Sequence, residues 1–266
     1  MPINAIRLQI NNAHNAHSCD DILCQLCNKR FWESRIPSNR RSAFHTIKPQ
    51  SENLHWYLNK IIRHVEQNFP IHLAIVGKDP YRTGPIGIPF AKSTLEATFS
   101  TDSGKVLFPA LGIQIENWIR CNRDVIGFYD ELCNRGIVFL NVSYKFIGDD
   151  FVKSRQLQFL KCANLYNKPI LETAENVVLC GKAEKGTKWA NSETLPYYTN
   201  ALKPWHPSAS EPSSNASQTK KNNYLQKWKP YWGGSGNLLR MLEPNDSGPI
   251  HEAIREINEL VQGTTL

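Results

Sequence analysis

The segment Gly77-Lys78-Asp79-Pro80-Tyr81 places a carboxylate at the point where an apolar run breaks into a tight loop. Pro80 fixes its own φ near −65° and has no amide hydrogen, so the Asp79 carboxylate lies on a stiff turn. Stiffness of this kind suits a catalytic group, and Tyr81 and Phe90 bring two aromatic rings toward the same place. Without further motifs, an Asx-turn role is the commoner explanation of Asp79, and the two rings could equally be core aromatics.

Two further polar side chains stand in comparable settings. Asn141 follows the apolar run Gly136–Leu140, and its planar amide carries both a hydrogen-bond donor and an acceptor. It is also ordinary turn chemistry at the end of a strand. His206 lies between Trp205 and Pro207, where an imidazole can be either a hydrogen-bond donor to a leaving group or a packed loop residue.

The segments that must position these residues alternate between apolar runs and helical periodicity. Strands are predicted over Ile71–Val76, Gly136–Leu140, Asn176–Cys180 and Tyr197–Leu202. Alternation of strands with helices predicts an α/β fold with a mostly parallel sheet covered on both faces. Ligands of such sheets bind beyond the carboxyl ends of the strands, which is where the singled-out polar residues fall.

Helices are expected between these strands and at both ends of the pattern. The predicted helical segments are Asn53–Asn68, Gly112–Ile126, Gly127–Asn134, Gln156–Asn164, a segment after Gly181, Asn222–Trp228 and Ile250–Gln262.

Four segments in this order resemble the uracil-DNA glycosylase superfamily, of which the chain looks like a divergent member. The first motif of that family is a Gly-x-Asp-Pro-Tyr loop followed by Gly-x-x-Phe, which Gly77–Tyr81 and Gly87–Phe90 match. Leu140-Asn141 matches the base-reading segment, Cys180-Gly181 a strand that ends in Gly, and His206-Pro207-Ser208 the His-Pro-Ser loop. Several motifs in order are more specific than any one alone.

The resemblance implies a three-layer α/β/α sandwich around a mostly parallel four-stranded sheet, spanning residues 51–266. It also implies a monofunctional DNA glycosylase that flips a pyrimidine out of DNA and hydrolyses its N-glycosidic bond, leaving an abasic site. Asp79 would stabilise the cationic sugar and orient the attacking water, and His206 would stabilise the departing base. Asn141 would read the base, Phe90 would stack on it, Tyr81 would exclude a 5-methyl group, and Lys78 would replace a Gln of the base-binding turn.

The chain departs from the family pattern around the duplex-binding loop. The usual His-Pro-Ser-Pro-Leu motif supplies a leucine wedge, whereas this chain reads His206-Pro207-Ser208-Ala209-Ser210. Contacts with DNA are expected from Pro207, Ser208 and Ser210 and from basic residues such as Lys182 and Lys185. Uracil is the expected base. A modified cytosine of hypermodified phage DNA, excised in antiviral defence rather than repair, and an inert DNA-binding or polymerase-tethering module are the alternatives.

Composition agrees with a nucleic-acid partner without requiring one. The net charge is +7 over 266 residues, compatible with phosphate binding or with an ordinary solvated surface. The apolar runs are too short to span a bilayer, and the start of the chain lacks the order of a secretory signal, so we expect no membrane association and a cytoplasmic, nucleoid or nuclear location. Hydrolysis needs no cofactor.

Residues 1–50 form a polar extension of unknown role. It contains the Cys24-Gln25-Leu26-Cys27 pair, which raises a metal site, but zinc usually requires two such pairs, so we expect cysteines on a helix face and no metal.

Overall fold

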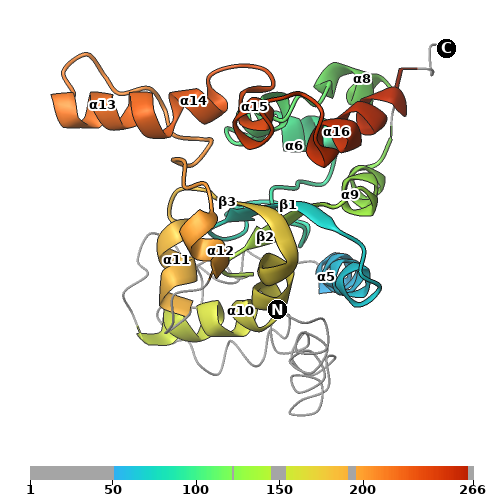
Figure 1. Ribbon diagram of the computed structural model, residues 1–266. Coiled ribbons are helices and arrows are strands. Elements are labelled where there is room, and N and C mark those ends of the chain that lie inside the picture. Colours follow the sequence, from blue (N-terminus) through green and yellow to red (C-terminus); the bar gives the residue numbers. More distant parts are fainter. Residues whose placement is uncertain (1–50, 122, 145–153, 191–195, 263–266) are drawn as a thin grey trace.

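A computed structural model describes residues 51–121, 123–144, 154–190 and 196–262 (Figure 1). The N-terminal extension with its Cys24 and Cys27 pair lies outside the described residues. The described part belongs to the α/β class, as the alternating pattern predicted. Among its helices, none is long and apolar enough to cross a membrane.

Three parallel strands form the sheet, in the order β2-β1-β3. They are β1 (Ile71–Gly77), β2 (Ile137–Asn141) and β3 (Ala174–Leu179), within a residue or two of the predicted ranges. The central position of β1 explains its nearly unbroken apolar sequence, because a strand covered by helices on both faces buries both sets of side chains. Its register pairs Gly77 with Asn141 and Val76 with Leu179, so the three strands end together.

The predicted strand Tyr197–Leu202 is wrong. The chain forms the short helix α12 (Pro196–Asn200) there, and proline is well suited to the first turn of a helix because its missing amide hydrogen is not needed. Leu202 retains a single parallel bridge to Val178. Its amide donates to the Val177 carbonyl at 2.9 Å, and its carbonyl accepts from the Leu179 amide at 2.8 Å. One residue therefore extends the sheet at the β3 edge.

Helices lie on both sides of the sheet. Below it in Figure 1 are α10 (Ser154–Thr173), α11 (Ala183–Ala190) and α12, and α10 packs on β1 and β3. On the other side, α16 (Pro249–Glu259) packs on β1. The helix α5 (Ser51–Glu66), which matches its predicted range, packs on α10, and α9 (Val125–Asn134) packs on β2.

The helix predicted over Gly112–Ile126 is divided. The helix α8 covers Ile115–Arg120, and α9 already begins at Val125, because the carboxylate of Asp124 accepts a hydrogen bond of 2.7 Å from the Gly127 amide and caps the new helix. The structure also contains helices that the periodicity did not predict: α6 (Leu95–Phe99), α7 (Gly104–Ala110), α14 (Lys229–Trp232) and α15 (Asn237–Leu242).

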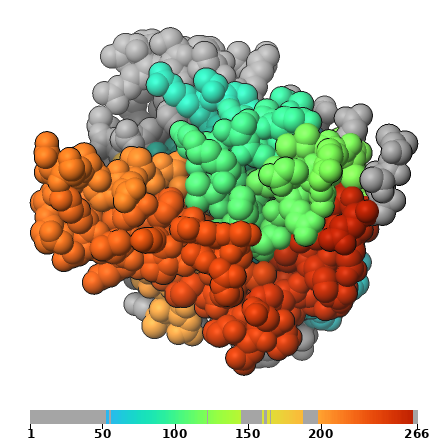
Figure 2. All heavy atoms as spheres, turned by 90° about the horizontal axis from the view of Figure 1, so that it is seen from above, coloured from blue at the N-terminus to red at the C-terminus, as the bar shows by residue number. Residues whose placement is uncertain are grey.

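These short helices join distant parts of the chain on one face of the molecule. Both α14 and α15 pack against α7. Figure 2 shows the result, with the green segments from the middle of the chain beside the orange and red C-terminal segments. The helix α13 (Gln218–Lys227) precedes α14 and projects from the body of the molecule in Figure 1. It begins four residues before the predicted helix Asn222–Trp228.

Candidate functional site

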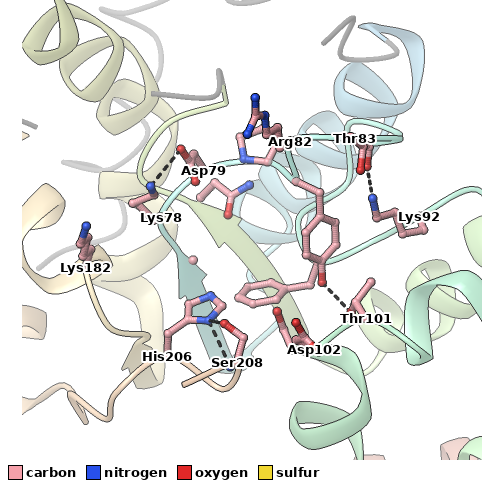
Figure 3. Close-up of a pocket in the computed structure, with 16 residues that line it drawn as sticks. Lys78, Asp79, Arg82, Thr83, Lys92, Thr101, Asp102, Lys182, His206 and Ser208 are labelled. Carbon is pink, nitrogen blue, oxygen red and sulfur yellow. Dashed lines mark hydrogen bonds and ion pairs between the residues drawn. The ribbon is translucent and has the colours of Figure 1, made fainter. Parts of the chain in front are cut away.

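A cavity of about 620 Å³ opens beyond the carboxyl ends of β1 and β2 (Figure 3). Its walls come from the loop after β1, the end of β2, the connection between α6 and α7, and the loops after β3 and after Leu202. The residues that line it are Gly77, Lys78, Asp79, Pro80, Tyr81, Arg82, Thr83, Phe90, Lys92, Thr101, Asp102, Ser103, Asn141, Lys182, His206 and Ser208.

The end of β1 and the end of β2 meet at Gly77 and Asn141. A β-carbon on Gly77 would lie 2.6 Å from the Asn141 Oδ1 and 2.9 Å from the Phe90 Cζ, closer than real side chains approach. Glycine is therefore required for the Asn141 amide and the Phe90 ring to occupy the same wall. The Asn141 side chain is 3% exposed, so its amide is fixed in a largely dehydrated position.

The Asp79 loop is held by the chain that follows β2. The Val142 amide donates to the Gly77 carbonyl at 3.0 Å, and the Ser143 amide donates to the Lys78 carbonyl at 3.1 Å. The Asp79 side chain is only 8% exposed, and its Oδ2 lies 3.4 Å from the Lys78 Nζ, whose side chain is 16% exposed. The site thus contains an adjacent carboxylate and ammonium, as Figure 3 shows.

Phe90 closes the floor of the cavity in an unusual backbone conformation. Its φ is +62°, which is uncommon for a bulky residue and marks a position that the surrounding structure holds in place. The ring contacts Phe139 edge-on, with centroids 5.9 Å apart. It also lies nearly parallel to the His206 ring, at 17° and 6.2 Å between centroids.

Tyr81 forms a second aromatic wall. Its hydroxyl and the Thr101 Oγ1 are 3.0 Å apart, in hydrogen-bond contact, and the Lys92 ammonium lies over its ring, 4.7 Å from the centroid. Burial raises the pKa of the Tyr81 hydroxyl, so the phenol stays neutral. The Lys92 ammonium also donates to the Thr83 carbonyl, which connects the two ends of the loop between Tyr81 and α6.

The loop that carries His206 is attached on two sides. Toward the sheet, the Gly181 amide donates to the Pro204 carbonyl at 2.9 Å, and a β-carbon at Gly181 would lie 3.0 Å from the His206 backbone nitrogen. Toward the C-terminal helices, the Trp205 amide donates to the Lys227 carbonyl, and the Trp232 indole donates to the Trp205 carbonyl, both at 2.7 Å.

The surroundings of the imidazole ring determine the protonation state of His206. Its Nδ1 accepts a hydrogen bond from the Ser208 backbone amide at 3.3 Å and lies 2.8 Å from the Ser208 Oγ. Because an amide can only donate, Nδ1 carries no proton, and the neutral ring has its hydrogen on Nε2. Burial, and then the nearby Lys78 ammonium, lower the pKa of the imidazole from 6.5 to about 4. At neutral pH the ring is a neutral donor.

The structure brings most of the predicted site residues to this cavity. Asp79, His206, Lys78, Tyr81, Phe90, Asn141, Ser208 and Lys182 all line it. Pro207 is buried, Ser210 and Lys185 are exposed, and none of the three lines the cavity. Their DNA contacts stay predictions.

Several lining residues were not predicted. Thr101, Asp102 and Ser103 enter through the turn between α6 and α7, and Lys92 enters by its contact with Tyr81. No local pattern marks them, because only tertiary packing places that turn beside the Asp79 loop. Lys78 and Asp79 were both predicted to belong to the site, but their contact with each other was not. The signal for it is the adjacent opposite charges in the Gly77–Tyr81 motif. Within the described ranges, no group of three or more His, Cys, Asp or Glu side chains is arranged to hold a metal ion.

Comparison with known proteins does not assign the chain to a family. No protein-family model matches the chain, and no curated protein matches it either.

Proposed function

We propose that the chain is a DNA glycosylase that flips a pyrimidine out of DNA and hydrolyses its N-glycosidic bond, leaving an abasic site. We also propose that its fold is the three-layer sandwich of the uracil-DNA glycosylase superfamily, with the Leu202 segment as the remnant of a fourth strand. The observation that carries this proposal is the convergence of Asp79, Asn141 and His206 on one cavity. They come from three segments far apart in the sequence.

The base would be held by the buried wall of the cavity. Extrusion from the duplex is necessary because the glycosidic bond is inaccessible within the stack. Asn141 then offers its donor and acceptor to the base edge, and Phe90 offers a ring face for stacking. Tyr81, held by Thr101 and Lys92, limits what the base can carry at its 5-position.

The bond would be broken by electrostatic stabilisation at both ends. As the bond lengthens, the sugar becomes cationic and the base becomes anionic. The Asp79 carboxylate stabilises the sugar and accepts a proton from the attacking water, which is the nucleophile at the glycosidic carbon. The Nε2 hydrogen of neutral His206 stabilises the base oxygen, an interaction that strengthens only in the transition state.

The polar part of the cavity lining favours a second candidate substrate. The wall of the cavity also includes Arg82, Thr101 and Asp102, side chains that can bind hydroxyl groups. Such a wall suits a cytosine with a hydroxylated or glucosylated 5-substituent, provided that Tyr81 moves aside. An enzyme for that base would act in antiviral defence, whereas an enzyme for uracil would act in repair.

Free-base release tests the proposal directly. DNAs that contain uracil, thymine, cytosine, hydroxymethylcytosine or glucosylated hydroxymethylcytosine are incubated with the protein, and released bases are identified by mass spectrometry. We expect release of uracil or of a modified cytosine. In Asp79→Asn, release should fall at least 100-fold, because the variant lacks the charge that stabilises the sugar cation.

The control is Glu116→Gln, which removes an exposed carboxylate on α8 that does not line the cavity and should leave base release unchanged. DNA binding by Asp79→Asn, measured by fluorescence anisotropy, should persist, which separates catalysis from affinity. Release of no base from any of these DNAs, together with unimpaired DNA binding, would instead indicate an inert binding module.

A further inference from the structure

A primary amine lies inside the cavity beside the carboxylate assigned to catalysis. The Lys78 Nζ is 3.4 Å from the Asp79 Oδ2, and both side chains are largely buried at the wall of the same cavity. The Lys78 charge also lowers the pKa of His206, which places the ammonium near both ends of the proposed reaction. The hydrolytic reaction proposed above assigns Lys78 no chemical step.

The other lysines of the cavity are placed differently. Lys92 donates to the Thr83 carbonyl and covers the Tyr81 ring, and Lys182 is an exposed residue at the rim. Lys78 therefore combines an enclosed amine with a neighbouring proton acceptor. Burial disfavours the charged form of an amine, and an uncharged lysine amine is a nucleophile toward carbonyl groups.

The product of the proposed reaction contains such a carbonyl group. An abasic deoxyribose opens to an aldehyde at C1′, to which an uncharged amine adds to give a carbinolamine. Loss of water then gives an imine. The imine makes a C2′ hydrogen acidic. When a base removes that proton, the electron pair left on C2′ forms a C2′=C3′ double bond, conjugated with the imine, while the 3′ C–O bond breaks. The 3′ phosphate leaves as an anion, so no oxidant or reductant is needed.

We propose that Lys78 is the nucleophile of an abasic-site lyase activity that follows base release. The Asp79 carboxylate accepts the proton that the Lys78 ammonium must lose before it attacks C1′, and it passes this proton to solvent. A carboxylate at this position also faces the sugar when the C2′ proton is removed. The inference rests on the proposed function for the location of the sugar, and it adds strand cleavage to an activity that would otherwise stop at the abasic site.

Borohydride trapping on a preformed abasic site tests this step without base excision. The protein is incubated with an oligonucleotide duplex that contains an abasic deoxyribose, and sodium borohydride reduces any imine to a stable amine. We expect a covalent protein–DNA adduct whose modified peptide contains Lys78. A duplex with a tetrahydrofuran analogue, which has no aldehyde, should give none.

Two variants complete the experiment. In Lys78→Arg, which keeps a positive charge but cannot form the imine, the adduct and the cleaved strand should both fall at least tenfold. Lys105→Arg changes an exposed lysine of α7 and should retain both. Thermal unfolding of each variant confirms that it folds.

An adduct mapped to another amine of the wild-type protein, or no adduct at all, overturns the proposal. The peptide map of the wild-type protein decides the point even if Lys78→Arg is unstable. Because the abasic site is preformed, trapping on Lys78 without release of any base would disprove the glycosylase activity and leave the lyase activity in place. Base release without trapping would support the glycosylase activity and overturn the lyase activity.

Discussion

Gly77 shows how strongly one backbone position can constrain a site. It pairs with Asn141 in the sheet, and the space that a side chain would need is filled by the Asn141 amide and the Phe90 ring. Since Phe90 already has a positive φ and His206 lies parallel to its ring, displacing Phe90 would also disturb the imidazole. The sequence alone shows a glycine in a motif, but it does not show which groups occupy the missing volume.

Gly77→Ala is expected to lower both stability and base release. The added methyl would lie 2.6 Å from Asn141 Oδ1, so either the amide or the Phe90 ring must move, at a cost of about 1–3 kcal/mol. The matched control is Gly127→Ala in α9, where the new methyl would be 3.5 Å or more from its neighbours. Chemical denaturation and base release measure the two effects, and equal behaviour of the two variants would contradict the prediction.

The buried neutral state of His206 predicts a pH dependence of stability. Its pKa is about 4 in the folded protein against 6.5 for the unperturbed group, so between these values the unfolded chain binds a proton that the folded chain does not. The free energy of unfolding must therefore decrease as the pH falls from 6.5 toward 4, by up to about 1.4 kcal/mol per pH unit. Below pH 4 this contribution is constant.

Urea unfolding at several pH values, compared between the wild-type protein and His206→Gln, isolates this effect. The variant cannot take up the proton, so its stability should fall less steeply between pH 6.5 and 4. Parallel curves for the two proteins would show that His206 is not buried as a neutral ring.

At the scale of elements, sequence patterns located the strands better than the short helices. The strand β1 is apolar over its whole length because helices cover both faces, and β2 has the same character, so both are visible in the sequence. The helices α6 and α7 are only five and seven residues long, too short for a periodic pattern. The turn between these two helices contains Thr101 and Asp102, so the sequence pattern did not predict that these residues line the cavity.

Under the proposed function, α13 is the element that we expect to contact DNA. It contains Lys220, Lys221 and Lys227 and no acidic residue, and the carbonyl of its last residue is hydrogen-bonded to the chain next to His206. It also carries the exposed Leu225, the kind of side chain that is missing from the loop after His206. Its basic character was visible in the sequence, but its attachment to the His206 loop was not.

Replacing Lys220 and Lys227 together by Gln should weaken DNA binding and its dependence on salt. Each lost phosphate contact reduces the slope of log K against log salt concentration by about 0.9, so we expect a reduction of about 1 to 2. Arg255→Gln is the control, because that guanidinium is already paired with Glu252 and Glu259 on α16. Anisotropy titrations at several salt concentrations measure the slopes, and an unchanged slope in the lysine variant would place the duplex elsewhere.

For the molecule as a whole, the parallel sheet is what made the site predictable. Parallel strands that end in register bring the residues after them to one edge, so Asp79 and Asn141 could be expected to meet. The position of His206 could not be expected in the same way, because His206 follows a segment for which the predicted strand, Tyr197–Leu202, was wrong. A single bridge at Leu202 and the close approach of Gly181 still bring it to the same edge. Its position depends on long-range hydrogen bonds, which leave no local signal in the sequence.

The two hydrogen bonds that tie Trp205 to the C-terminal helices have a consequence for chain connectivity. Residues 211–217, which join the His206 loop to α13, form an irregular and largely exposed connection that lines no part of the cavity. A protease recognition site inserted between Ser214 and Asn215 should permit a backbone nick without separation of the two polypeptides. Across the break, α14 and α15 remain packed on α7 and α16 on β1, and Trp205 remains hydrogen-bonded to Lys227 and Trp232. The nicked protein should elute as one species in size-exclusion chromatography and keep its activity, and two separate fragments would show that the covalent connection itself holds the His206 loop in place.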